Sequence, residues 1–123
     1  MQRTRAQGLE RQVWEATVAR IRDRLVQMAR NGDDPTDYST LWEQTGKLPS
    51  WHRFGAALQE VGRREHQAKH PPLLALAIRR SDKLPVSVAW ECFIDQGTNT
   101  SERREIHIAA LREVREFWRA HST

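Results

Sequence analysis

The chain has 123 residues, of which 38% are hydrophobic and 29% are charged, a composition typical of a folded domain rather than a disordered segment. No apolar run approaches the roughly 18 residues that a membrane span requires, and the first residues lack the apolar core of a secretory signal. One cysteine, Cys92, excludes an internal disulfide framework. We therefore expect a single domain over residues 1–123, located in the cytoplasm.

The formal net charge of +4 is distributed unevenly along the chain. Residues 1–30 carry seven basic and three acidic side chains, and residues 61–85 carry six and two. A basic patch beside a binding element is typical of proteins that contact phosphates. However, 17 of the 20 basic residues are arginine, a bias that a GC-rich genome also produces, so the charge alone does not decide the function.

The first predicted helix runs from Leu9 to Arg30. Apolar side chains recur along it at helical spacing: Val13, Ile21, Leu25 and Met28. Asn31 and Gly32 end it, because both residues tolerate the left-handed conformation that a helix end requires.

Two further helices are predicted in the middle of the chain. Asp37 or Thr36 can cap the first, which runs from Tyr38 to Gly46, by accepting a free backbone N–H. Ser50 is the expected cap of the second, which continues to about Gln67. Gly55 lies in its interior, where glycine weakens a helix, and therefore indicates the close approach of another helix. The expected core residues of this region are Leu41, Phe54, Leu58, Val61 and Leu74.

The next segment is predicted to form a two-stranded β-hairpin. Leu73–Ile78 is continuously apolar, as a buried strand would be, and Val86–Phe93 alternates with a period of two. The connection Arg79–Pro85 is short and basic. A last helix over residues 101–120 is expected to be capped by Ser101. Its apolar stripe consists of Ile108, Leu111, Val114, Phe117 and Trp118.

This order predicts an α+β, mostly helical fold. Residues 37–93 are expected to form a winged helix-turn-helix, and the helices at 9–30 and 101–120 flank it as extra N- and C-terminal elements. Helix, turn, helix and then a hairpin with a cationic tip is typical of proteins that bind a nucleic-acid duplex.

Two short motifs add a family resemblance. They are Asp37-Tyr38-Ser39-Thr40-Leu41-Trp42 and Phe54-Gly55-Ala56-Ala57-Leu58. With this spacing the segment resembles the winged-helix DNA-binding domain of methylated-DNA alkyltransferases and alkyltransferase-like proteins. Leu73 stands where that family has its alkyl-accepting cysteine, so the resemblance implies duplex binding without alkyl transfer. Tyr38 matches a family tyrosine that helps to rotate a base, and His52 falls at the position of the family's arginine.

The resulting hypothesis is a non-catalytic DNA-binding protein, nucleoid-associated in a bacterial or phage-infected cell, whose partner is double-stranded DNA. The predicted contact residues lie at the start of the first helix of the pair, in the turn after it, on the second helix and in the basic connection. They are Tyr38, Lys47, Ser50, Trp51, His52, Arg53, Gln59, Arg79, Arg80 and Lys83. An alternative is a protein-interaction adaptor or inhibitor encoded by a mobile element or phage, which pairs with a protein partner or with itself through the terminal helices.

No complete catalytic or metal-binding constellation is recognisable in the sequence. Asp82 and Glu91 resemble the carboxylate pair of a nuclease, but Phe93 stands where the usual lysine would be. His66 and His70 share a helix face without further zinc ligands at recognisable spacing. We therefore expect no catalytic residue, metal or cofactor. Four of the five tryptophans are expected in the core, namely Trp14, Trp42, Trp90 and Trp118, while Trp51 is expected either to pack inward or to meet the duplex.

Overall fold

Helices form most of the computed structural model, which describes residues 5–48, 50–92, 97 and 99–121. The α-helices are α1 (Arg5–Asn31), α2 (Tyr38–Gln44), α3 (Trp51–Gln67), α4 (Ser87–Cys92) and α5 (Thr100–Ala120). A 3₁₀ turn, η1 (Leu73–Leu76), and two short strands, β1 (Thr36–Asp37) and β2 (Ala77–Ile78), complete the elements. The predicted mostly helical α+β class is confirmed, and the predicted helices at 9–30, 38–46, 50–67 and 101–120 are all present.

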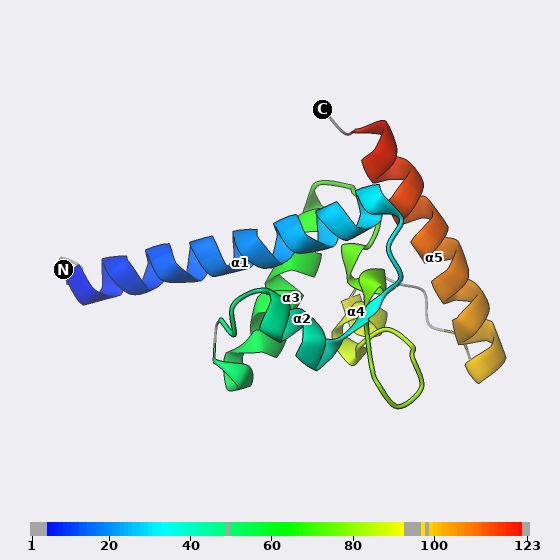
Figure 1. The fold of residues 1–123 in the computed structure, drawn as a ribbon, viewed down its shortest axis with the longest axis horizontal. Coiled ribbons are helices and arrows are strands. Elements are labelled where there is room, and N and C mark those ends of the chain that lie inside the picture. Colours follow the sequence, from blue (N-terminus) through cyan, green and yellow to red (C-terminus); the bar gives the residue numbers. More distant parts are fainter. Residues whose placement is uncertain (1–4, 49, 93–96, 98, 122–123) are drawn as a thin grey trace.

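The core is centred on η1, against which α1, α3 and α5 all pack. The four side chains of η1 are fully buried. In Figure 1, α1 crosses the molecule and its N-terminal half extends beyond the other elements, while α5 lies at the opposite end. The five predicted core residues, Leu41, Phe54, Leu58, Val61 and Leu74, are each 0% exposed, which confirms that prediction.

The predicted strand at Leu73–Ile78 is largely wrong. Its first four residues form η1, and only Ala77 and Ile78 are extended. These two residues pair in parallel with Thr36 and Asp37, far back in the sequence, and the Ala77 carbonyl also accepts one bond from the Val86 amide at 3.2 Å. A short apolar run that is buried on every side has no periodicity, so its sequence cannot distinguish a strand from a helical turn.

The second predicted strand is also wrong, because Ser87–Cys92 is the helix α4; Phe93 lies outside the described residues. The buried side chains are Val86, Ala89 and Trp90, which follow the i, i+3, i+4 spacing of a helix rather than the alternation of a strand. The Trp90 indole Nε1–H donates to the Pro85 carbonyl at 3.0 Å and fixes the start of this helix. In a segment of six residues, the spacing of apolar side chains in a helix cannot be distinguished clearly from the alternation in a strand.

A two-stranded hairpin ladder is therefore absent from residues 73–92. The connection survives as a tight loop, residues 79–85, which we call the basic loop. An antiparallel bridge between Ile78 and Pro85 closes it, and the Arg79 amide donates to the Leu84 carbonyl at 2.8 Å.

The three predicted helix N-caps had different outcomes. Asp37 caps α2 as expected, and its Oδ1 accepts the Thr40 amide at 3.0 Å. Ser50 precedes α3 but its side chain makes no capping bond. Ser101 lies inside α5, and the cap is Asn99, whose side chain accepts the Glu102 amide at 3.0 Å.

Two residues of the predicted apolar stripes face solvent. Val13 and Ile108 are each 59% exposed. Val13 belongs to α1 and Ile108 to α5, and each lies on the side of its helix that faces away from the core. Within the described ranges, no helix has the length and apolar character needed to cross a membrane.

Candidate nucleic-acid interface

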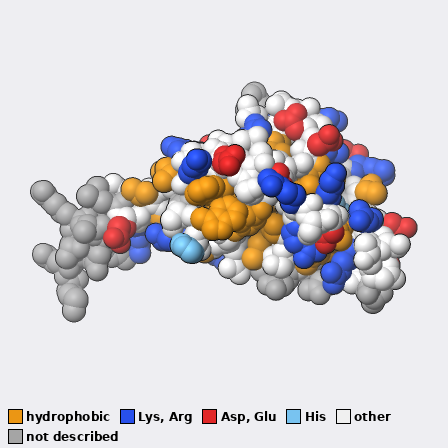
Figure 2. Space-filling model, turned by 60° about the horizontal axis from the view of Figure 1, so that its bottom comes forward, with side chains coloured by type: hydrophobic (Ala, Val, Ile, Leu, Met, Phe, Trp, Pro, Cys, Tyr) orange, Lys and Arg blue, Asp and Glu red, His pale blue; other side chains and the backbone are white. Residues whose placement is uncertain are grey.

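Four aromatic side chains from α2 and the start of α3 form a cluster, which we call the aromatic cluster: Tyr38, Trp42, Trp51 and Phe54. The Tyr38 ring packs edge-on against Trp51 and Phe54, with centroids at 5.1 and 5.0 Å, and Trp42 lies 5.2 Å from Trp51. Trp51 nevertheless remains 45% exposed. Figure 2 shows hydrophobic side chains gathered over α2 and the start of α3, with Lys and Arg side chains around them.

Gly55 explains how α2 fits so closely against α3. A Cβ atom at this position would lie 2.9 Å from the Tyr38 hydroxyl oxygen. The predicted close approach at Gly55 is therefore confirmed, and its partner is a side chain of α2. Burial raises the pKa of Tyr38, so the phenol stays neutral at the bottom of the cluster.

The basic loop is attached to the start of α2 through Arg80. Its guanidinium donates to Asp37 Oδ1 at 3.2 Å and to Ser39 Oγ at 3.1 Å, and its side chain is 78% exposed. Hydrogen bonds from the backbone and hydroxyl of Thr40 hold the pKa of Asp37 far below its ordinary value, with smaller contributions from Ser39 and Arg80. Asp37 therefore remains charged and holds Arg80 beside Tyr38.

Within the basic loop, Arg79 pairs with Asp82 through both guanidinium donors. Burial raises the pKa of Asp82, but hydrogen bonds from the Leu84 amide and Arg79 outweigh it and the pKa falls. Arg79 thus stabilises the loop. Arg80 and Lys83 form, with residues 34–37 and Ile78, a groove of about 490 Å³.

The leading end of α3 carries several of the predicted contact residues. Ser50, Trp51 and His52 are exposed, and so is Lys47 in the preceding turn. The Lys47 amide donates to the Trp42 carbonyl at 2.8 Å, and its φ of 60° places it in the left-handed region. Lys47 is thus fixed to the end of α2, next to the aromatic cluster.

Arg53 and Gln59 lie away from this group. The Arg53 guanidinium stacks over the Trp14 ring of α1, 4.8 Å from its centroid, so it points toward α1 rather than toward the basic loop. Gln59 is exposed two helical turns beyond His52 on the same side of α3.

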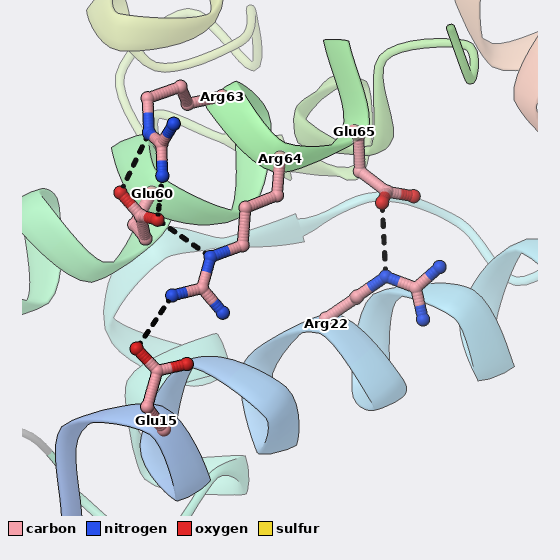
Figure 3. Close-up of polar contacts among 6 residues, drawn as sticks. All are labelled: Glu15, Arg22, Glu60, Arg63, Arg64 and Glu65. Carbon is pink, nitrogen blue, oxygen red and sulfur yellow. Dashed lines mark hydrogen bonds and ion pairs between the residues drawn. The ribbon is translucent and has the colours of Figure 1, made fainter. Parts of the chain in front are cut away.

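The second half of α3 contains an ion-pair network that the sequence analysis missed (Figure 3). Glu60 accepts hydrogen bonds from Arg63 and Arg64, and Arg64 also donates to Glu15 of α1 at 2.8 Å. The hydrogen bonds from Arg63 and then Arg64 lower the pKa of Glu60 to about 2. The i+3 and i+4 spacing of Glu60, Arg63 and Arg64 could have predicted the part within α3. These two arginines are neutralised within the chain.

A second missed contact is buried. Glu65 is 3% exposed and accepts from the Arg22 Nε–H at 3.0 Å (Figure 3), while His70 Nδ1 lies 3.2 Å from its other oxygen. The His70 ring therefore interacts with a buried carboxylate inside the molecule. Among the described residues, no three His, Cys, Asp or Glu side chains are grouped as a metal site. The side chains of Glu91 and Cys92 lie outside the described part.

The predicted tryptophan positions divide as follows. Trp90 and Trp118 are buried, as expected, and Trp14 and Trp42 are partly buried against the core.

The structure brings seven of the ten predicted contact residues to the neighbourhood of the aromatic cluster and the basic loop: Tyr38, Lys47, Ser50, Trp51, His52, Arg80 and Lys83. Tyr38 connects the two parts, because it follows the Asp37 that binds Arg80 and packs against Trp51. Arg53 and Gln59 lie outside this group, and Arg79, although part of the basic loop, is paired with Asp82.

No protein-family model matches the chain, and searches of curated proteins and of solved structures find no match either.

Proposed function

We propose that this chain binds double-stranded DNA without catalysis, with α2 and α3 as a helix-turn-helix pair and the basic loop as a short wing. The observation that carries the proposal is that the start of α2 contacts both parts: Asp37 binds Arg80, and the next residue, Tyr38, packs against Trp51. The start of α2 joins an exposed cation to the exposed leading end of a helix, and these are the two features with which such a fold contacts a phosphate backbone and a groove.

The residues would have different roles. Lys47 and Lys83 are exposed charges suited to phosphates, and Arg80 would add a third because its side chain is 78% exposed even though it donates to Asp37. Such contacts make affinity fall as salt rises. His52 and Gln59 lie on the solvent side of α3, where they would face base edges. Arg53 and Arg79 would contribute through the packing of α1 and of the loop, since each already has an internal partner.

The three lysines provide a direct test. Lys47, Lys69 and Lys83 all have φ near +60°, so a Lys→Glu change has a similar backbone context at each. Lys47 precedes α3 and Lys69 follows it, which separates them by roughly 25 Å. Fluorescence anisotropy with a labelled random duplex should give a much weaker affinity for Lys47→Glu, and an affinity near that of the unchanged chain for Lys69→Glu.

A second candidate function is a protein-interaction module. Leu48 is 43% exposed and Trp51, three residues later, is 45% exposed, and exposed apolar side chains often mark a protein contact. The two functions predict different sensitivities. A protein partner held by this patch would be lost in Leu48→Ser and Trp51→Ser variants and would tolerate high salt, whereas duplex binding would be salt-sensitive and lost on charge reversal.

A further inference from the structure

The outer side of α5 carries charges that have no partner inside the molecule. Arg104, Glu105, Arg112 and Glu113 are all exposed. None of the four takes part in an ion pair with a described residue. This differs from α3, where Glu60, Arg63 and Arg64 neutralise one another.

The spacing of these charges explains why they stay unpaired. Side chains on a helix meet at three or four residues apart. Arg104, Glu105 and Glu113 have no residue of opposite charge at either distance, and only Arg112 has one, Glu116. The exposed face of α5 therefore carries both positive and negative side chains, but their spacing allows few ion pairs within the helix.

The same order is complementary to a second copy that runs in the opposite direction. Consider a twofold axis perpendicular to α5 that passes between Ile108 and Ala109. It places Glu105 opposite Arg112 of the second copy and, by symmetry, Arg112 opposite Glu105 of the second copy. A parallel twofold pair would instead bring each charge to its own equivalent and would be repulsive.

The centre of this face is apolar. Ile108 and Ala109 are both exposed, and Ile108 is 59% exposed. On the helix surface, Ile108 and Ala109 lie on either side of the line that joins Glu105 to Arg112. The twofold axis therefore passes through the middle of the exposed face of α5. In Figure 1, α5 forms the end of the molecule opposite the N-terminus of α1 and away from α2. Pairing there leaves the aromatic cluster open.

We propose that two copies of this chain associate through antiparallel α5 helices, with Ile108 and Ala109 at the centre and two symmetric Glu105–Arg112 pairs across the twofold axis. The contact is a small, polar one, so the dimer forms at high protein concentration and weakens with salt.

Charge exchange at one pair tests this arrangement. Glu105→Arg would face Arg112 of the other copy, and Arg112→Glu would face Glu105, so each change alone creates two repulsive contacts. The double variant restores both pairs with their signs exchanged. Sedimentation velocity at high micromolar concentration and low salt measures self-association, and circular dichroism verifies that each variant keeps its helices.

The expected result is a dimer for the unchanged chain, roughly tenfold or weaker association for each single variant, and recovery in the double variant. The proposal is overturned if the unchanged chain is monomeric under these conditions. It is equally overturned if the single variants associate like the unchanged chain, or if the double variant fails to recover.

Discussion

The hydroxyl of Tyr38 lies directly over Gly55, where a Cβ atom would come within 2.9 Å of it. An alanine there would gain about 1 kcal/mol in helix propensity, but it would displace a ring that Trp51 and Phe54 hold on two sides. Overpacking of this kind costs about 1–3 kcal/mol. We therefore expect Gly55→Ala to lower the free energy of unfolding by about 1 kcal/mol in urea denaturation.

The matched control makes the same Gly55→Ala change in a Tyr38→Phe variant, which lacks the hydroxyl. Among the described residues, and apart from the chain neighbours and the backbone of α3 itself, no other atom lies within 4 Å of the position that the new Cβ would take. Removal of the hydroxyl therefore removes the clash. In that background Gly55→Ala should be neutral or stabilising. Equal destabilisation in both backgrounds would contradict the contact.

Arg22 neutralises the buried Glu65, and its loss should be costly. Arg22→Met would leave the carboxylate with His70 alone, and an uncompensated buried charge costs several kcal/mol. Because Arg22 is 34% exposed, we expect about 2 kcal/mol in denaturant unfolding. Arg24→Met is the control, since Arg24 bonds only exposed glutamines, and it should change stability by less than about 0.5 kcal/mol. Similar effects of the two changes would refute this role of Arg22.

Lys69 ends α3 in the left-handed conformation, with φ of 61°, a conformation that glycine adopts without strain. The bond from the His70 amide to the Glu65 carbonyl, 2.9 Å, completes a Schellman-type end. Lys69→Gly should therefore raise the free energy of unfolding by up to about 1 kcal/mol. Ala68→Gly, where φ is −80°, should lower it. Thermal unfolding of the two variants would show the opposite signs, and a loss of stability in both would be inconsistent with strain at Lys69.

His107 should make stability depend on pH near neutrality. It is buried, and its Nε2–H donates to the Ala75 carbonyl at 2.7 Å. Burial lowers its pKa, with Arg115 adding to the effect, against an opposing contribution from the Ala75 carbonyl. The unfolded chain then binds the proton first, so stability falls as the pH drops below about 6.5.

Melting temperatures between pH 7 and 5 would measure this loss, and His107→Gln should flatten the curve. Carboxylates titrate at lower pH than His107. The stability that Glu60 contributes is fully present above its ordinary pKa of 4.5 and is lost as the pH falls through its lowered pKa of about 2. An unchanged slope between pH 7 and 5 in His107→Gln would assign the loss to other groups.

The helices could be predicted closely because their ends are chemically marked. Asp37 caps α2, and Gly32 and Gly46 adopt positive φ at or just beyond the ends of α1 and α2. The segments 73–78 and 86–92 could not be predicted, since each is a short apolar run whose conformation depends on the surrounding helices. Pairing of Ala77 and Ile78 with residues 36–37 is a long-range contact without a local signal.

The sequence indicated which residues of the candidate site are exposed, but not which side chains they contact. Trp51 and His52 are exposed in the first turn of α3, and Lys47 is exposed in the turn that precedes it, which their positions around the predicted start of this helix indicate. The stacking of Arg53 on Trp14 depends on how α1 crosses α3, which no sequence spacing encodes. The pair Arg79–Asp82 has an i, i+3 spacing and could have been anticipated for a tight loop.

The most direct test of the proposed function compares duplex binding by Lys47→Glu and Lys69→Glu across a range of salt concentrations. Duplex contact at the leading end of α3 predicts salt-dependent binding by the unchanged chain, at least roughly tenfold weaker binding by Lys47→Glu, and little change in Lys69→Glu. Equal affinities of the two variants, or no salt-dependent binding by the unchanged chain, would contradict it.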